Sequence, residues 1–312
     1  MPELWLNYGG TDIILDLKVE NLSLVENSKF DIRTNERLAE NIKSIPVTNE
    51  TTLVPLDGSN STVQITAALV SQAQCTGISL SIESIPSARK KLSNKISTQN
   101  ITIIEKNTDH FIKRANEKST IFISKSNIDP FFGYYGTPTN LLRLIEQNKM
   151  NEVFHSRVDD LPHPGEKCPP TEIANEFCEN MEAKSIEIIS NNSGIHNIYY
   201  GQITESFQNA TDKLTNLSLE NEQELKSLIL GTNIDSSSSG TLTSSLDLLW
   251  NSINVLKKNA TVVIISENSK GFGSQALEKL AYGKLKLEDY RNYDYFDGLE
   301  HLMFINSLSE KY

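Results

Sequence analysis

IDPFFGYYGTPTNLLRLIEQNKMNEVFHSRVDDLPHPGEK is the sequence of residues Ile128–Lys167, the stretch that decides the fold. Directly before it, Ser119–Lys125 (STIFISK) is apolar and rich in β-branched residues, which predicts a buried strand. Thr137 as N-cap and Pro138 at the first helical position predict the start of a helix. Asp129–Gly136 is therefore predicted as a strand-to-helix loop. In open α/β sheets such loops lie at the carboxyl ends of the strands, where ligands bind.

The chain before this stretch alternates between strand and helix patterns. Glu3–Tyr8 and Thr11–Lys18 predict a hairpin around Gly9 and Gly10, a pair suited to positive φ. Further runs of β-rich residues, and of apolar residues at helical spacing, predict strands at 51–56, 78–82, 101–105 and 120–124 and helices at 61–74, 87–96 and 110–115. This alternation is typical of a mostly parallel sheet.

After the central stretch, a helix is predicted over Thr171–Met181, and a strand pair follows at 185–190 and 195–200. A second α/β unit is predicted to begin near residue 222, with strands at 227–230, 261–266 and 302–305 and a helix at 240–256. The polar stretch Asn209–Gln223 is the predicted hinge, although it also fits one exposed helix that continues the first half. The predicted fold class is α/β, with two domains at 1–215 and 222–312 built on mostly parallel sheets flanked by helices.

Composition restricts the classes of partner. The formal net charge of -11 argues against nucleic acid or an anionic membrane, since both need a basic face. The basic run Arg89–Lys91 with Lys95 fits a solvated helix face better than a nucleic-acid site. No apolar run approaches the ~20 residues that span a bilayer, and Met1–Gly10 lacks the features of a signal peptide. We therefore expect a cytoplasmic protein that binds a small molecule, with its oligomeric state open.

Three loops contain residues that can do chemistry. The loop Asp57–Ser61 leads into a predicted helix and offers amides and hydroxyls to an anion, or else a simple N-cap. The loop Gly271–Ser274 has the same geometry, or else is a tight turn that needs glycine. His155, His163, Lys167 and Cys168 form the third group, which fits either a general base with a reactive lysine or solvated surface. The three cysteines, Cys75, Cys168 and Cys178, fit neither a disulfide framework nor a zinc knuckle.

These motifs are similar to those of the nickel-dependent lactate racemase family. That family's loop resembles E-P-H-F-F-x-G-F-S-G-G, and this chain has IDPFFGYYG at Ile128–Gly136. Its E-x-x-x-G-x-G-S turn resembles Glu267–Ser274, and its D-x-T-R-P loop resembles the loop that begins at Asp57. The opening hairpin also resembles its N-terminal strands, so the similarity covers nearly the whole chain in order. The resemblance implies a lactate racemase-like fold.

The resemblance also implies a chemistry. The family exchanges a proton or hydride at the α-carbon of a 2-hydroxy acid, using a nickel-pincer nucleotide bound to a lysine. His155 is in the place of a catalytic histidine, and Lys167 is the candidate for the lysine that holds the cofactor. The other positions that the resemblance assigns to the cofactor are Asp57, Ser59, Gly133, Gly136 and Gly273.

Several family positions differ in this chain. Thr171 and Glu172 stand where the family has its nickel-binding histidine, so no metal ligand is assigned. Glu83–Pro86 contains no histidine where the family's first catalytic histidine is expected, and Asn60 replaces the arginine of the D-x-T-R-P loop. Thr232–Leu256 lacks the family's Gln and Lys. A two-base racemase needs an acid and a base on opposite faces of the stereocentre, and loss of the arginine removes a carboxylate clamp.

Two functional hypotheses follow from these residues. In the first, the chain is a divergent racemase or epimerase of a 2-hydroxy acid that uses the nickel-pincer nucleotide, with His155 as base and Lys167 as cofactor anchor. In the second, it is a catalytically silent relative that binds a small ligand or a protein partner in a cleft between its two domains.

Overall fold

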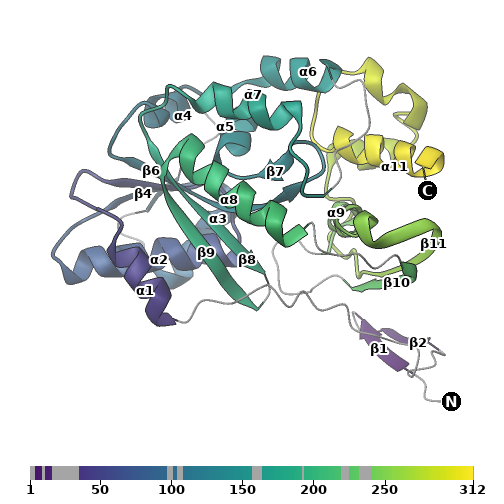
Figure 1. Cartoon of the computed structure of the whole chain (residues 1–312), viewed down its shortest axis with the longest axis horizontal. Coiled ribbons are helices and arrows are strands. Elements are labelled where there is room, and N and C mark those ends of the chain that lie inside the picture. Colours follow the sequence, from purple (N-terminus) through teal and green to yellow (C-terminus); the bar gives the residue numbers. More distant parts are fainter. Residues whose placement is uncertain are drawn as a thin grey trace.

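The computed structural model describes residues 4–8, 11–15, 35–96, 101–103, 108–156, 164–191, 193–218, 225–231 and 240–311 (Figure 1). Its centre is a seven-stranded sheet with the strand order β5-β4-β3-β6-β8-β9, and β7 pairs with β6 beside this path. The strands of this sheet are β3 (Thr52–Pro55), β4 (Ser81–Ser84), β5 (Ile101–Ile103), β6 (Thr120–Asp129), β7 (Gly133–Tyr135), β8 (Lys184–Asn191) and β9 (Gly194–Gln202). Pairing is parallel from β5 through to β8, whereas β9 and β7 pair antiparallel.

Helices cover both faces of this sheet (Figure 1). One face packs against α1 (Asn35–Lys43), α2 (Asn60–Cys75) and α3 (Pro86–Lys95) through one apolar cluster. The other face packs against α4 (Thr108–Ala115), α5 (Thr137–Ile145), α7 (Pro169–Cys178) and α8 (Ile203–Ser218). Since apolar side chains alternate between the two faces of each strand, Leu53 and Val54 of β3 lie in different clusters.

The last part of the chain forms a smaller α/β unit. Its strands β10 (Leu225–Gly231) and β11 (Leu256–Ile265) pair in parallel as a separate two-stranded sheet. Its helices are α9 (Leu242–Asn251), α10 (Gln275–Ala281), α11 (Leu299–Lys311) and two 3-10 turns, η3 (Ile253–Val255) and η4 (Leu287–Asn292). One apolar cluster joins α9 to α11 with α6 (Gln147–Ser156) and with Phe131 and Phe132. The C-terminal unit therefore shares a core with Phe131 and Phe132, which lie near the start of the segment 128–167.

Two further predicted features have clear outcomes. The opening hairpin is confirmed as β1 (Leu4–Tyr8) paired antiparallel with β2 (Thr11–Leu15). Residues 209–218 of the predicted hinge lie in α8, the alternative interpretation, and 219–224 are outside the described residues. The division into two domains stays a prediction. Among the described residues, no helix is both long and apolar enough to cross a bilayer.

Three local predictions were wrong. The strand predicted at 302–305 is part of α11, because a short buried apolar run fits a helix as well as a strand. The helix predicted at 240–256 ends at Asn251, and β11 begins at Leu256. Residues 129–136, predicted as a loop, mostly form a β-hairpin, because β6 continues to Asp129 and β7 pairs antiparallel with it. Gly136, not Thr137, is consequently the N-cap of α5.

Candidate functional site at the carboxyl edge of the sheet

The Asp57 loop is held by its own carboxylate. Asp57 follows β3, and its Oδ2 accepts a hydrogen bond of 2.7 Å from the backbone N–H of Lys125 on β6. Its Oδ1 accepts a bond of 2.9 Å from the N–H of Ser59. Ser59 is the N-cap of α2, and its hydroxyl oxygen accepts from the N–H of Thr62 at 3.2 Å. Asp57 and Ser59, both predicted site residues, therefore position the amino end of α2 against the end of β6.

Two lysines flank this loop. Lys91 of α3 donates hydrogen bonds to the carbonyl of Gly58 at 2.9 Å and to Oδ1 of Asn60 at 3.0 Å. Partial burial lowers the pKa of Lys91, the Asp57 carboxylate opposes this, and the nearby ammonium of Lys270 lowers it further. Lys270 belongs to the C-terminal unit. The loop predicted to bind an anion therefore has positive charge from both units beside it.

Lys125 is the second flanking lysine. It lies near the carboxyl end of β6, within a strand that is otherwise largely buried. Burial lowers the pKa of Lys125, and the charge of Asp57 partly opposes that effect. Among the described residues, none accepts a hydrogen bond from its ammonium group or forms an ion pair with it. A partly buried cation without a direct partner would gain an ion pair from an anionic ligand.

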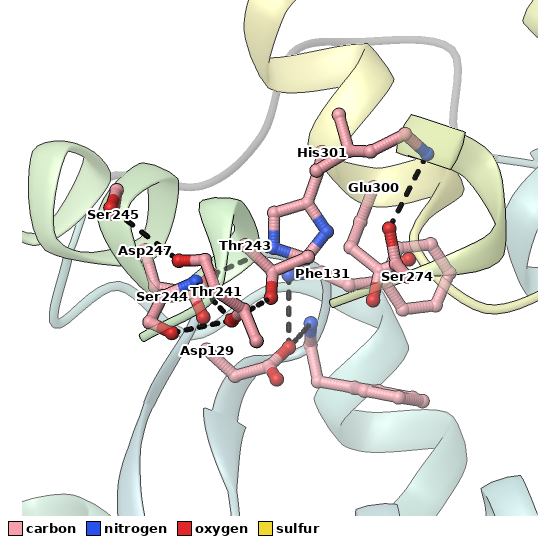
Figure 2. A network of polar contacts seen from close by, with 12 residues as sticks. Asp129, Phe131, Thr241, Thr243, Ser244, Ser245, Asp247, Ser274, Glu300 and His301 are labelled. Atoms are coloured by element: carbon pink, nitrogen blue, oxygen red, sulfur yellow. Dashed lines mark hydrogen bonds and ion pairs between the residues drawn. The ribbon is translucent and has the colours of Figure 1, made fainter. Parts of the chain in front are cut away.

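A second group of charges, which includes Asp129, Glu300 and His301, lies where the sheet meets the C-terminal unit (Figure 2). Arg143 of α5 forms ion pairs with Asp129 of β6 at 3.2 Å and with Glu300 of α11 at 3.8 Å. Asp129 Oδ1 also accepts from the N–H groups of Phe131 and Phe132 at 2.9 and 2.7 Å. We call Asp129, Arg143, Glu300 and their ionic partners the charged cluster. It connects the hairpin of β6 and β7 to the last helix, α11.

His301 completes the charged cluster. Its Nε2 is 2.9 Å from Oδ1 of Asp247 on α9. Burial alone would lower the pKa of His301, but the hydrogen bond with Asp247 and the charges of Glu300, Asp247 and Asp129 raise it to about 9. Burial raises the pKa of Glu300, and His301 and Arg143 oppose that rise. The imidazole is consequently cationic at neutral pH and balances carboxylates from three elements.

Tyr135 lies between the two groups of charges. Burial raises the pKa of its phenol, and the negative charge of Asp57 raises it further, while a hydrogen bond with Asn140 lowers it. The charges of Arg143 and Asp129 also act on this phenol. Tyr135 therefore links the Asp57 loop to the charged cluster along one edge of the sheet.

The predicted glycines have packing roles. Gly133 has φ of +79°, and a Cβ there would be 2.5 Å from the carbonyl oxygen of Glu166. A Cβ on Gly136 would be 2.6 Å from the ring of Phe207. Gly273 has φ of +84°, and its Cβ would overlap the side chains of Thr241 and Thr243. None of these observations tests a role in cofactor binding, which stays a prediction.

His155 and Lys167 lie on other parts of the surface. His155 is exposed near the end of α6, with its ring against Phe154 at a centroid distance of 5.3 Å. Lys167 is exposed and forms an ion pair with Asp212 of α8 at 3.0 Å. Among the described residues, no hydrogen bond or ion pair joins either side chain to the Asp57 loop. His163 is outside the described residues, and the roles predicted for His155 and Lys167 stay predictions.

Sequence reasoning missed most of the charged cluster. Arg143 interrupts the apolar helix sequence LLRLI, and Glu300 and His301 precede LMFI in α11. Lys125 lies in the polar sequence SKSN of β6, so it gave no comparable signal. A charged residue within an otherwise apolar element was the available signal, because such residues are rarely buried unless they are paired.

A cavity of about 480 Å³ lies at the opposite end of the sheet. It is lined by the end of α7, the start of β8 and the start of α8, including Lys118, Cys178, Lys184 and Thr204. Burial raises the pKa of the Cys178 thiol, which makes it a poor nucleophile. In α/β sheets ligands bind at the carboxyl ends of the strands, so we assign the candidate site to the Asp57 and Lys125 edge.

The residues described here do not fit the nickel-pincer nucleotide. Thr171, at the position of the family's nickel-binding histidine, is buried and donates its hydroxyl to the carbonyl of Phe132. The amine of Lys167 is engaged by Asp212. Among the described residues, no group of three or more His, Cys, Asp or Glu side chains is arranged to hold a metal ion.

Comparisons with known proteins agree on the fold alone. No protein-family model matches the chain, and no curated protein matches it. The structure of the lactate racemase apoprotein from Thermoanaerobacterium thermosaccharolyticum is similar, with a TM-score of 0.68 and 11% sequence identity. The match covers 99% of this chain and 87% of that chain. The predicted α/β fold, with a mostly parallel sheet flanked by helices, is therefore confirmed, and it is similar to the fold of lactate racemase.

Proposed function

We propose that this chain is a binding protein with a lactate racemase-like fold that takes a small carboxylate, of the 2-hydroxy acid class, at the Asp57 and Lys125 edge. The observation that carries the proposal is Lys125, a partly buried lysine near the carboxyl end of β6 whose ammonium forms no hydrogen bond or ion pair with a described residue. The amino end of α2 and the ammonium of Lys91 lie beside the same loop and add to the attraction for an anion. Neither nucleic acid nor membrane is part of the proposal.

The proposal sets nickel-dependent racemisation aside on the chemistry of the residues. Lys167, the candidate cofactor lysine, is paired with Asp212, and Thr171, which stands in place of the nickel-binding histidine, is buried and donates its hydroxyl to a backbone carbonyl. His155 is exposed and lies on α6, away from the elements that form the Asp57 loop. In this reading the fold is retained for binding, and no proton transfer is assigned to a residue.

The competing function, a nickel-dependent racemase or epimerase, is favoured by the similarity of the fold to lactate racemase. It is tested by producing the chain together with the enzymes that make the nickel-pincer nucleotide. Intact mass and metal analysis then report whether the nucleotide is attached. We expect an unmodified mass without bound nickel, and a nickel-containing adduct that disappears in Lys167→Ala would establish the competing function.

Binding is tested by thermal unfolding and calorimetry with D-lactate, L-lactate and glycolate. A ligand that binds only the folded state at 100 times its Kd stabilises it by about 2.7 kcal/mol. We expect that shift in the unmodified chain and its loss in Lys125→Met. Lys118→Met is the matched control, because Lys118 is 80% exposed and lies at the opposite end of the sheet. Equal shifts in all three proteins would contradict the proposal.

A further inference from the structure

Strands β10 and β11 have apolar sequences typical of buried strands, but none of their residues is buried. Parallel strands are normally buried on both faces and are rich in Val, Ile and Leu, as LKSLILG and ATVVII are here. Every residue of β3 in the central sheet is buried. Within the two described strands β10 and β11, by contrast, no residue is buried. A layer that covers this small sheet is therefore missing from the described contacts.

One face of this sheet is the more exposed. Ile229 and Val263 are direct neighbours across the two strands, and 38% and 43% of their surfaces are exposed. Ser227 and Thr261 form the adjacent cross-strand pair two residues earlier, so they lie on the same face. We call these four residues the Ile229–Val263 face. Two adjacent exposed apolar side chains on the face of a strand pair form a surface suited to packing against another β-structure.

The chain contains a segment that needs such a surface. The hairpin β1–β2 has the strand sequences LWLNY and TDIIL, which are mostly apolar. A lone two-stranded hairpin is at best marginally stable in water, so it requires a surface to pack against. Residues 16–34 connect it to α1, and 19 residues span up to about 60 Å when extended. The hairpin can consequently reach the far end of the molecule.

Charge favours the same pairing. The first sixteen residues contain Glu3, Asp12 and Asp16 and neither lysine nor arginine. Strand β11 carries Lys257 and Lys258 a few residues before Thr261, whereas Lys226 of β10 alternates with Ser227 and lies on the opposite face. Opposite charges around an apolar contact set its register and orientation more than its strength. A second copy of the chain that presented the same face would instead bring the lysines of β11 together.

We propose that the β1–β2 hairpin docks on the Ile229–Val263 face and forms the missing layer of the C-terminal sheet. The contact would join the first residues of the chain to its last unit, and it is independent of the function proposed above. The contact would give each of the two-stranded sheets, β1–β2 and β10–β11, a partner to pack against.

The two tryptophans, Trp5 in the hairpin and Trp250 in α9, make the contact measurable. Trp250→Phe leaves Trp5 as the single tryptophan. We expect blue-shifted emission from Trp5 with protection from acrylamide, and we expect Val263→Asp in that background to remove both. Ile112→Asp is the matched control, because Ile112 of α4 is 40% exposed and belongs to the other unit.

Hydrogen exchange on the chain with both tryptophans provides a second readout if Trp250→Phe does not fold. Val263→Asp should then remove amide protection from β1 and β2, whereas Ile112→Asp should not. Trp5 emission typical of free solvent, or hairpin protection unchanged by Val263→Asp, overturns the proposal. Light scattering that shows a dimer broken by Val263→Asp, with Trp5 unchanged, would also overturn it and would assign the face to a second copy.

Discussion

Glu187 of β8 is a fully buried carboxyl group whose protonation is coupled to folding. Its Oε2 accepts from the hydroxyl of Ser126 at 2.6 Å, and its Oε1 accepts from the N–H of Thr137 at 3.1 Å, at the start of α5. Burial raises the pKa of Glu187 from 4.5 to about 7, although these hydrogen bonds oppose the rise. The carboxyl therefore binds its proton more tightly in the folded chain than in the unfolded chain.

The sign of the pH effect follows from this difference. Between pH 4.5 and about 7 the folded state holds more protons on Glu187, so the free energy of unfolding falls as the pH rises. Each unit of difference between the folded and unfolded pKa corresponds to about 1.36 kcal/mol. The free energy of unfolding that Glu187 contributes therefore falls by about 3 kcal/mol between pH 4.5 and a pH above 7. In Glu187→Gln the amide oxygen can still accept from Thr137, and the amide nitrogen can donate to Ser126. The variant should consequently lose the titration and keep the hydrogen bonds.

Urea unfolding between pH 4.5 and 8 measures the effect. The stability of Glu187→Gln relative to the unmodified chain should increase by about 3 kcal/mol across that range, because other titrating groups cancel in the difference. Glu182→Gln is the control, since the Glu182 side chain is 53% exposed and should give parallel curves. Parallel curves for Glu187→Gln as well would refute the assignment of a proton to the buried carboxyl.

Three other predictions concern the cap, the glycine turn and the charged cluster. Ser59→Ala should lower the free energy of unfolding by about 1 kcal/mol in urea melts, whereas Ser59→Asp should retain the cap. Gly273→Ala should cost clearly more than the roughly 1–2 kcal/mol of a left-handed alanine, while Gly271→Ala, with φ of +82° and no neighbour within 4 Å, should cost only that amount. The raised pKa of His301, about 9, contributes stability below pH 6.5 that is lost as the pH rises through 9, and Asp247→Asn should flatten that part of the pH profile of unfolding; an unchanged profile would contradict the ion pair.

The elements that were predictable had local signals. Strand β3 and the first half of β6 are short runs rich in apolar and β-branched residues, and Ser59 is a recognisable N-cap, so the Asp57 loop was placed from nearby residues alone. The strand predicted at 302–305 failed because LMFI has no internal period that separates a strand from a buried helix face. Tertiary packing against α9 and α10 decided that case.

The charged cluster was not predictable from spacing because its members are far apart in the chain. Asp129 and Arg143 are separated from Glu300 by more than half of the sequence, and only the shared apolar core brings α11 onto this edge. Arg143 stands among apolar neighbours and the pair Glu300 and His301 precedes an apolar run, so the sequence indicates burial but not the identity of the partner. Lys125 differs, because it lies in the polar sequence SKSN of β6 and its ammonium group forms no hydrogen bond or ion pair with a described residue.

The environment of Lys125 explains how a chain with a net negative charge could bind an anionic ligand. The formal net charge of -11 repels anions at long range, but at physiological ionic strength charges beyond about 8 Å are largely screened. Within that range of the Asp57 loop, local cations decide the attraction. Arg143 and His301 are balanced by Asp129, Glu300 and Asp247, so they add little net charge there. Lys125 has only the longer-range influence of Asp57 to balance it, which makes its ammonium the group that an incoming carboxylate would pair with.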